Sequence, residues 1–119
     1  VIMSKTDTFV EKTCIPCEGG VPRFDIDQAQ AVIKNIPNWE LNEDATNIFR
    51  NFSFDNFREA QNFAVKVGEL AEQEFHHPDI SYGWGYCKIL FQTHKIRGLH
   101  ENDIIMAAKV DAILSNETD

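Results

Sequence analysis

Residues 72–103 read EQEFHHPDISYGWGYCKILFQTHKIRGLHEND, and every histidine of the 119-residue chain lies within this stretch: His76, His77, His94 and His100. Imidazole is the side chain whose charge changes near neutral pH. A chain that concentrates its histidines in about a quarter of its length is expected to carry its functional site there.

The same stretch predicts the end of a helix and two strands. Pro78 cannot continue a helix, so the helix that apolar periodicity predicts over residues 55–75 ends near His76 or His77. Alternating apolar and polar side chains predict strands over residues 79–82 and 86–93. The histidine pair is therefore expected at a helix C-terminus, and the third histidine just beyond a strand end.

Outward from this stretch, the pattern predicts four further elements. They are a helix over residues 25–36, which Asp25 or Asp27 can cap, a hairpin of strands over 39–42 and 46–54, and a last helix over 102–114. Residues 115–119 are expected to fray. The order of elements predicts an α+β fold, with a four-stranded antiparallel sheet and three helices packed on one face.

The length suits one domain, which we expect over residues 25–119, behind an extended N-terminal arm over residues 1–24. The arm contains Cys14 and Cys17 in a C-x-x-C spacing, which is either half of a zinc site or two thiols in a loop. Completing a zinc site would require Cys87 or the histidines.

The composition excludes some classes of partner. The net charge is −8, with 19 acidic and 11 basic residues, and a nucleic-acid binder needs a basic face. A neutral or weakly polar small molecule fits this charge better than a polyanion. No apolar run reaches the roughly 20 residues of a membrane helix. The odd number of cysteines and a start without a signal-like segment predict a cytoplasmic protein.

The histidines suggest acid–base chemistry. One imidazole can be a protonated acid while a second is a free base, and this pairing suits an elimination of water. Glu72 lies one helical turn before His76 and is expected to hold an imidazole in one tautomer.

Other interpretations stay open at this level. A histidine at a helix C-terminus is often only a partner of the helix dipole, and Asp103 at a helix start is stabilising without catalysis. Three histidines and a carboxylate are also a zinc or iron ligand set. His100 is interpreted as a surface residue, and Trp39 and Trp84 as rings that pack in the core or on the sheet.

The spacing of these residues resembles the signature of the pterin-4a-carbinolamine dehydratases. The matching positions are Glu72, His76-His77-Pro78, Trp84, His94 and Asp103. Flanking residues resemble the family as well, over about residues 25–114: Trp39, Ile48-Phe49, Phe52, Phe54 and Gly98-Leu99. The C-x-x-C arm and the Gly98–Asp103 run resemble its bacterial branch.

The resemblance implies an α+β subunit that dehydrates 4a-hydroxytetrahydrobiopterin to quinonoid dihydropterin and water, with no metal or organic cofactor. This reaction recycles the tetrahydropterin of aromatic amino acid hydroxylases such as phenylalanine hydroxylase. A homodimer or homotetramer is expected, without nucleic-acid or membrane partners. The alternative is a non-catalytic binding module, like the animal relatives that serve as dimerisation cofactors of a transcription factor.

The resemblance also implies roles for individual residues. His76 and His94 would be the acid and base, and His77 would chiefly hold the pterin. Substrate contacts or support would come from His77, Pro78, Thr93, Glu72, Asp103 and Trp39. Three positions depart from the family: Phe75 replaces an Asp found in some members, Gln92 replaces a common Ser, and His100 replaces the usual Ser or Thr at a helix N-cap.

Overall fold

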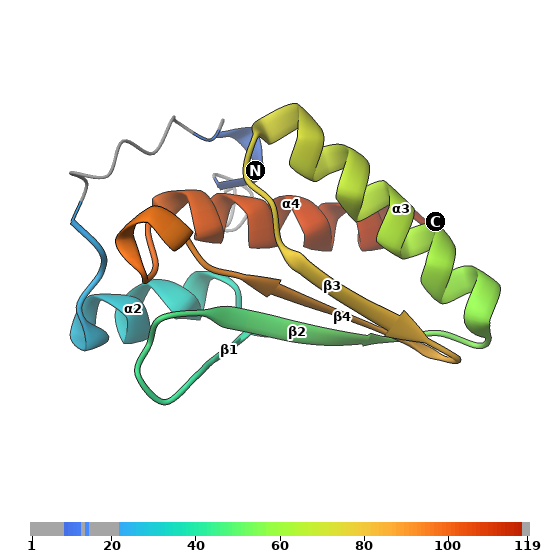
Figure 1. Ribbon diagram of the computed structural model, residues 1–119, viewed down its shortest axis with the longest axis horizontal. Helices are drawn as coiled ribbons and strands as arrows, with labels where there is room; N and C mark the ends of the chain where they lie inside the picture. Colours follow the sequence, from blue (N-terminus) through green and yellow to red (C-terminus); the bar gives the residue numbers. More distant parts are fainter. Residues whose placement is uncertain (1–8, 13, 15–21, 118–119) are drawn as a thin grey trace, which may run out of the picture.

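The fold is an antiparallel sheet crossed on one face by two long helices, as the computed structural model shows (Figure 1). The structure describes residues 9–12, 14 and 22–117. Its elements are α2 (Ile26–Val32), η1 (Ile33–Asn35), β1 (Glu40–Leu41), β2 (Ile48–Ser53), α3 (Phe57–Glu74), β3 (Asp79–Gly83), β4 (Tyr86–Phe91), η2 (His94–Ile96) and α4 (Glu101–Glu117). The predicted α+β class and four-stranded antiparallel sheet are confirmed.

Strand β4 lies between β2 and β3, which gives the strand order β1-β2-β4-β3. Its inward side chains Cys87, Ile89 and Phe91 are fully buried, as the alternation in the sequence predicted. Gly85 closes the β3–β4 hairpin with φ +81, a left-handed conformation that other residues seldom adopt. Because β4 is central, its end is fixed on both sides before the chain reaches His94.

Helices α3 and α4 cover the inner face of the sheet, while α2 lies beside the end of the sheet at which α4 begins (Figure 1). The ring of Phe63 on α3 packs between those of Phe52 and Phe54, with centroids 4.7 and 5.2 Å away. Fully burying one such ring contributes about 1.5–3 kcal/mol. This aromatic packing fixes α3 over the sheet, and with it the position at which α3 ends.

Both early helices start at a side-chain cap. Asp25 and Gln28 form a reciprocal capping box at α2, and Asn56 accepts the backbone N–H of Glu59 at α3. Asp25 was one of the two caps predicted for the first helix. These caps set the register of the helices that follow.

Helix α3 ends at Glu74 because Phe75 adopts a left-handed conformation with φ +54. The backbone N–H of His76 then returns to the carbonyl of Ala71, 3.2 Å away. The helix therefore stops before His76, and the histidine pair leaves it in a turn. The sequence predicted this end to within three residues, because Pro78 cannot continue a helix.

Most element boundaries differ by a few residues from the sequence prediction; the strand predicted over residues 86–93, for example, ends at Phe91. Helix α4 continues through Glu117, three residues beyond the predicted end at Leu114, and residues 118–119 lie outside the described part. Within the predicted arm, residues 9–11 form a helical turn, whereas Cys17 lies outside the described residues. The boundary between arm and domain stays a prediction.

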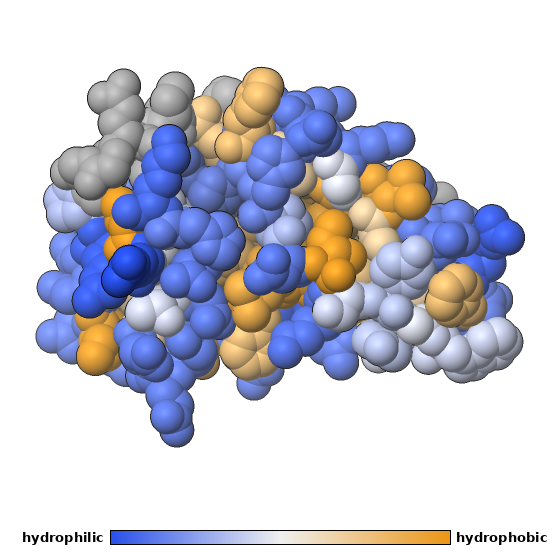
Figure 2. Space-filling view, viewed as in Figure 1, coloured by the Kyte–Doolittle hydropathy of each residue, from blue (hydrophilic) through white to orange (hydrophobic). Residues whose placement is uncertain are grey.

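The surface is mostly hydrophilic on the face that Figure 2 shows, with hydrophobic patches separated by polar residues. Within the described residues, we find no helix that combines the length and the apolar character needed to cross a membrane.

Candidate functional site

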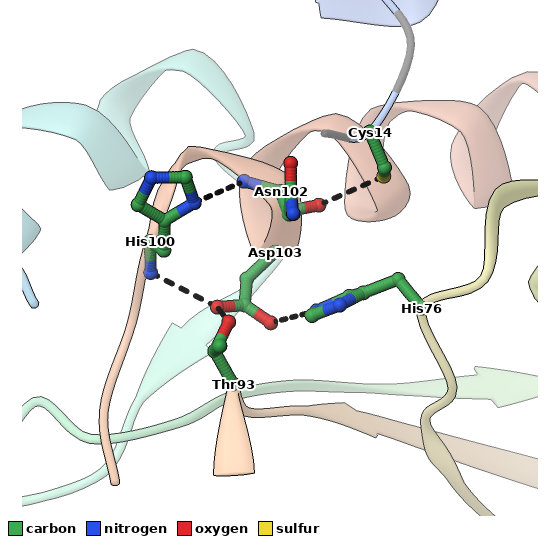
Figure 3. Close-up of polar contacts among 6 residues, drawn as sticks. All are labelled: Cys14, His76, Thr93, His100, Asn102 and Asp103. Carbon is green, nitrogen blue, oxygen red and sulfur yellow. Dashed lines mark hydrogen bonds and ion pairs between the residues drawn. The ribbon is translucent and has the colours of Figure 1, made fainter. Parts of the chain in front are cut away.

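A buried carboxylate, that of Asp103, joins three segments of the chain (Figure 3). The side chain is 0% exposed and accepts three hydrogen bonds. The donors are His76 Nε2 at 2.6 Å, Thr93 Oγ1 at 2.7 Å and the backbone N–H of His100 at 3.0 Å. Asp103 thus links the turn after α3, the end of β4 and the start of α4.

The local sequence explains why Asp103 lies there. His100 precedes α4, and Asp103 is the third residue of that helix, the position from which an acidic side chain reaches back to the N-cap N–H. His100 Nδ1 in turn accepts the N–H of Asn102 at 3.4 Å. Asp103 therefore stabilises the start of α4 and binds His76 as well. His100 takes part in the same contacts and is the N-cap residue of α4.

His76 is held on two sides. Its side chain is 11% exposed, and its ring stacks on that of Phe91, with centroids 6.1 Å apart and an interplanar angle of 12°. Because a carboxylate only accepts hydrogen bonds, we assign the ring hydrogen to Nε2, which leaves the lone pair on Nδ1. This fixes the tautomer and orientation of an imidazole suited to accept a proton at Nδ1.

His77 pairs with Glu72 through Nε2, and the two side chains are 55% and 76% exposed. Glu72 thus pairs with an imidazole, as expected, but it is that of His77 and not that of His76, which lies one helical turn after it. The left-handed turn at Phe75 breaks the helical spacing, so the second histidine of the pair, rather than the first, meets Glu72. An ion pair this exposed contributes little to stability.

His94 follows Thr93 directly and begins the single turn η2, with an exposed side chain. Thr93 is buried, and its backbone pairs with that of Gly98, with N···O distances of 2.9 Å and 3.4 Å. The loop that carries His94 is thus closed at its base and tied to Asp103 through the Thr93 hydroxyl. Pro78, which follows His77, is half-buried.

Trp39 lies apart from this group. It is 3% exposed, packs against Phe52 and Phe91, and donates from Nε1 to both carboxylate oxygens of Asp111, at 3.0 and 3.1 Å. Its indole N–H is therefore occupied inside the core. The interpretation of Trp39 as a core ring fits this position, whereas a substrate contact does not.

Sequence reasoning missed the ion pair behind Trp39. Arg50 donates to Asp111 Oδ1 at 2.7 Å, and its guanidinium lies 4.3 Å from the centre of the Phe52 ring. Burial raises the pKa of the Asp111 carboxyl, while the Trp39 and Arg50 hydrogen bonds oppose that rise. The sequence did contain a signal for this ion pair: Arg50 and Asp111 are charged residues on the inward faces of β2 and α4.

Two further observations bear on possible ligands. Across residues 9–12, 14 and 22–117, no three His, Cys, Asp or Glu side chains gather closely enough to hold a metal ion. An open groove of about 1110 Å³ lies away from the histidines, between the end of β2, the outer side of α3 and residues 113–114 of α4.

Comparison with known proteins points to one family. The family model described as pterin 4 alpha carbinolamine dehydratase matches residues 22–113. A relative from Methylococcus capsulatus, named "Putative pterin-4-alpha-carbinolamine dehydratase", is 58% identical over 86% of this chain and 90% of its own. A relative of the same name from Halorhodospira halophila is 53% identical over 93% of this chain and 98% of its own.

Solved structures share the fold. A transcriptional coactivator/pterin dehydratase from Brucella melitensis superposes with a TM-score of 0.71 at 27% identity, over 76% of this chain and 97% of its own. A pterin dehydratase-like protein identified as a RuBisCO assembly factor in the α-carboxysome gives a TM-score of 0.55 at 25% identity, over 64% of this chain and 88% of its own.

Proposed function

We propose that this chain, which belongs to the pterin 4 alpha carbinolamine dehydratase family, converts 4a-hydroxytetrahydrobiopterin to quinonoid dihydropterin and water. The observation that carries the proposal is the buried Asp103 carboxylate. It orients His76 directly and ties down, through Thr93, the strand end from which His94 follows.

The reaction needs one acid and one base. In the substrate, C4a carries a hydroxyl and the neighbouring N5 carries a hydrogen. Loss of water breaks the C4a–O and N5–H bonds and forms a C4a=N5 double bond, so no oxidant or reductant is consumed. Each well-positioned acid or base contributes about 10²- to 10⁴-fold in rate.

His76 suits the role of base, because Asp103 binds Nε2 and leaves Nδ1 to take the N5 proton. Asp103 then stabilises the imidazolium that forms, as a carboxylate does beside a histidine base. His94 supplies the proton to the departing hydroxyl. The two epimers of the substrate present the hydroxyl on opposite faces of the ring, so the two imidazoles exchange roles between them.

His77 orients the pterin rather than moving protons. Its ring is more than half exposed and is steadied by Glu72. We expect His77→Ala to raise KM with little change in kcat, because it removes binding that is equal in the ground and transition states. Steady-state kinetics separate the two constants, and an unchanged KM would contradict this role.

In the cell, this activity would recycle the tetrahydropterin spent by an aromatic amino acid hydroxylase such as phenylalanine hydroxylase. The chemistry requires no metal or organic cofactor, since both protons move between imidazoles and substrate. The net charge of −8 is compatible with a substrate that carries no phosphate or carboxylate.

The decisive experiment mixes the chain with freshly generated 4a-hydroxytetrahydropterin and follows quinonoid product by absorbance. His76→Ala and His94→Ala should each slow dehydration by about 10²- to 10⁴-fold. The matched control is His100→Asn, which also removes a histidine yet keeps a capping side chain, and it should retain near-normal activity. Near-normal rates in both alanine variants would refute the assigned roles.

A protein-binding role is the second candidate, because the solved relative from Brucella melitensis is named as a transcriptional coactivator as well as a dehydratase. Wild-type protein that is folded yet fails to accelerate dehydration would favour it.

A further inference from the structure

Cys14 contacts the chain on both sides of the His76–Asp103 pair. Its backbone N–H donates to Glu74 Oε1 at 2.9 Å, and its thiol donates to the carbonyl of Asn102 at 3.8 Å. Glu74 is the last residue of α3 and lies two residues before His76, while Asn102 directly precedes Asp103. One residue near the start of the chain thus bridges the two segments that bring the pair together. Figure 3 shows its contact with Asn102.

The residues before Cys14 are anchored to the same helix. We call the described residues 9–12 and 14 the brace. Val10 accepts a hydrogen bond from Lys109 Nζ at 2.9 Å, and Lys12 pairs with Glu101 at 2.6 Å. Phe9, Val10 and Cys14 also pack against the hydrophobic core. The family match covers residues 22–113, so the brace precedes the matched region.

The Cys14 thiol serves the brace as a neutral group. Burial, followed by the negative charge of Glu74, raises the pKa of Cys14 to about 12. At neutral pH the thiol is therefore protonated and a poor nucleophile. The contacts of Cys14 with Glu74 and Asn102 therefore explain the presence of this cysteine better than a role in chemistry would.

The end of α3 needs such an anchor. The single left-handed residue Phe75 separates Glu74 from His76. This residue is 85% exposed, so packing of its side chain does not fix the turn. The Glu74 side chain, in contrast, is 13% exposed and also lies 3.9 Å from Lys109 Nζ. Glu74 is thus the point at which the brace holds the chain just before His76.

We propose that Glu74 is a positioning residue for the His76–Asp103 pair, acting through its hydrogen bond to the backbone of Cys14. Glu74 and the brace set the distance between the end of α3 and the start of α4, and so keep His76 Nε2 within hydrogen-bond reach of Asp103. This inference rests on the proposed function for its kinetic consequence, but the geometry of the pair can be measured without activity.

The kinetic test compares Glu74→Ala with Glu74→Gln. The amide oxygen of glutamine can still accept the Cys14 N–H, whereas alanine cannot. We expect Glu74→Ala to lower kcat by about 10- to 100-fold with KM nearly unchanged, because a small misplacement of a catalytic group costs rate rather than binding. Glu74→Gln should stay within about threefold of wild type. Equal losses in both variants would assign the effect to the negative charge and overturn the proposal.

The second test detects the hydrogen bond between His76 and Asp103 directly. In wild-type protein labelled with ¹⁵N-histidine, the Nε2–H proton of His76 should appear downfield and show slow exchange, because it is buried and bonded to a carboxylate. Glu74→Ala, studied well below its unfolding temperature, should broaden or lose this signal, and Glu74→Gln should keep it. An unchanged signal in Glu74→Ala would overturn the proposal.

The two measurements separate the failure of this inference from failure of the proposed function. A wild-type protein that does not dehydrate the carbinolamine, but whose His76 signal depends on Glu74, would refute the function and keep the positioning role. Cys14→Ala is the matched control for the thiol. It retains the backbone N–H and should retain both activity and signal, and loss of either would transfer the role from Glu74 to the sulfur.

Discussion

Asp103 shows how one side chain can serve both a helix and an imidazole, that of His76, for which we propose a catalytic role. A buried carboxylate is costly unless donors surround it, and here a side-chain hydroxyl, a backbone N–H and an imidazole do so. Hydrogen bonds to a charged acceptor are stronger than neutral ones, at about 1.5–3 kcal/mol each. The oriented imidazole is therefore part of the same network that stabilises the start of α4.

Asp103→Asn tests this double role. The amide has one acceptor oxygen in place of two, so at least one buried donor loses its partner. We expect a loss of about 1–3 kcal/mol in the free energy of unfolding, together with a marked fall in kcat. Denaturant unfolding and steady-state kinetics measure the two effects.

The control for Asp103→Asn is Glu101→Gln, which changes another acidic residue in the same helical turn. Its side chain is 43% exposed and pairs with Lys12 on the surface. The expected change is within about 0.5 kcal/mol. A comparable loss in both variants would show that charge at the helix start, rather than the buried network, sets the stability.

At the scale of elements, the periodicity of apolar residues predicted most of the fold. The sequence predicted three features that depend on side chains close to one another in the chain. These are the inward face of β4, the α2 cap at Asp25 and the end of α3 near Pro78. The side chains that pair with the histidines were not predicted correctly by local spacing. Glu72 was matched to His76 by helical spacing, but one left-handed residue changed which histidine it meets.

The contacts that remained hidden join residues far apart in the chain. Asp111 with Trp39, and Glu74 with Cys14, are separated by 72 and 60 residues. Their pairing depends on how α3 and α4 pack, which no local pattern encodes. Resemblance to a family indicated the histidines together with Glu72 and Asp103, but the carboxylates of Asp111 and Glu74 were found only in the structure.

Gly68 offers a prediction at this scale, because it lies in the middle of α3 with open space around the position of an added Cβ. Glycine inside a helix costs about 0.5–1 kcal/mol relative to alanine. Gly68→Ala should therefore raise the free energy of unfolding by about that amount and leave kinetics unchanged. Thermal and denaturant unfolding check the gain, and a loss would mean that the helix packs against a partner at this point.

At the scale of the whole molecule, the Trp39–Asp111–Arg50 cluster joins α4 to two places on the sheet side of the core. A carboxyl whose pKa is higher in the folded than in the unfolded state binds its proton more tightly when folded. Its contribution to stability is thus full at low pH and is lost as the pH rises through the raised pKa.

We therefore expect wild type to lose stability relative to Asp111→Asn as the pH rises from the ordinary aspartate pKa of 3.8 towards neutrality. Urea unfolding of both proteins across this pH range measures the difference between their free energies of unfolding. The contributions of the other carboxyl groups are the same in both proteins and cancel in this difference. A difference that moves the opposite way would mean that the Arg50 and Trp39 hydrogen bonds outweigh burial. A constant difference would mean that they balance it.

The sheet also bears on assembly. Strand β3 pairs with β4 on one side only within the described residues, and β1 is a two-residue strand at the other edge. An open edge strand is a template for pairing with another chain, which supports the expected homodimer or homotetramer. Light scattering at micromolar concentration should give a mass of two or four chains, and the mass of one chain would contradict this.

The double duty of Asp103 has an evolutionary consequence. A descendant that kept this fold but lost the proposed dehydration activity would be free to exchange all three histidines of the site. It would still need an acceptor at position 103 to begin α4, since the His100 N–H and the Thr93 hydroxyl would remain buried there. Retention of the aspartate alone is therefore a poor marker of an active relative, and the imidazoles are what should be sought.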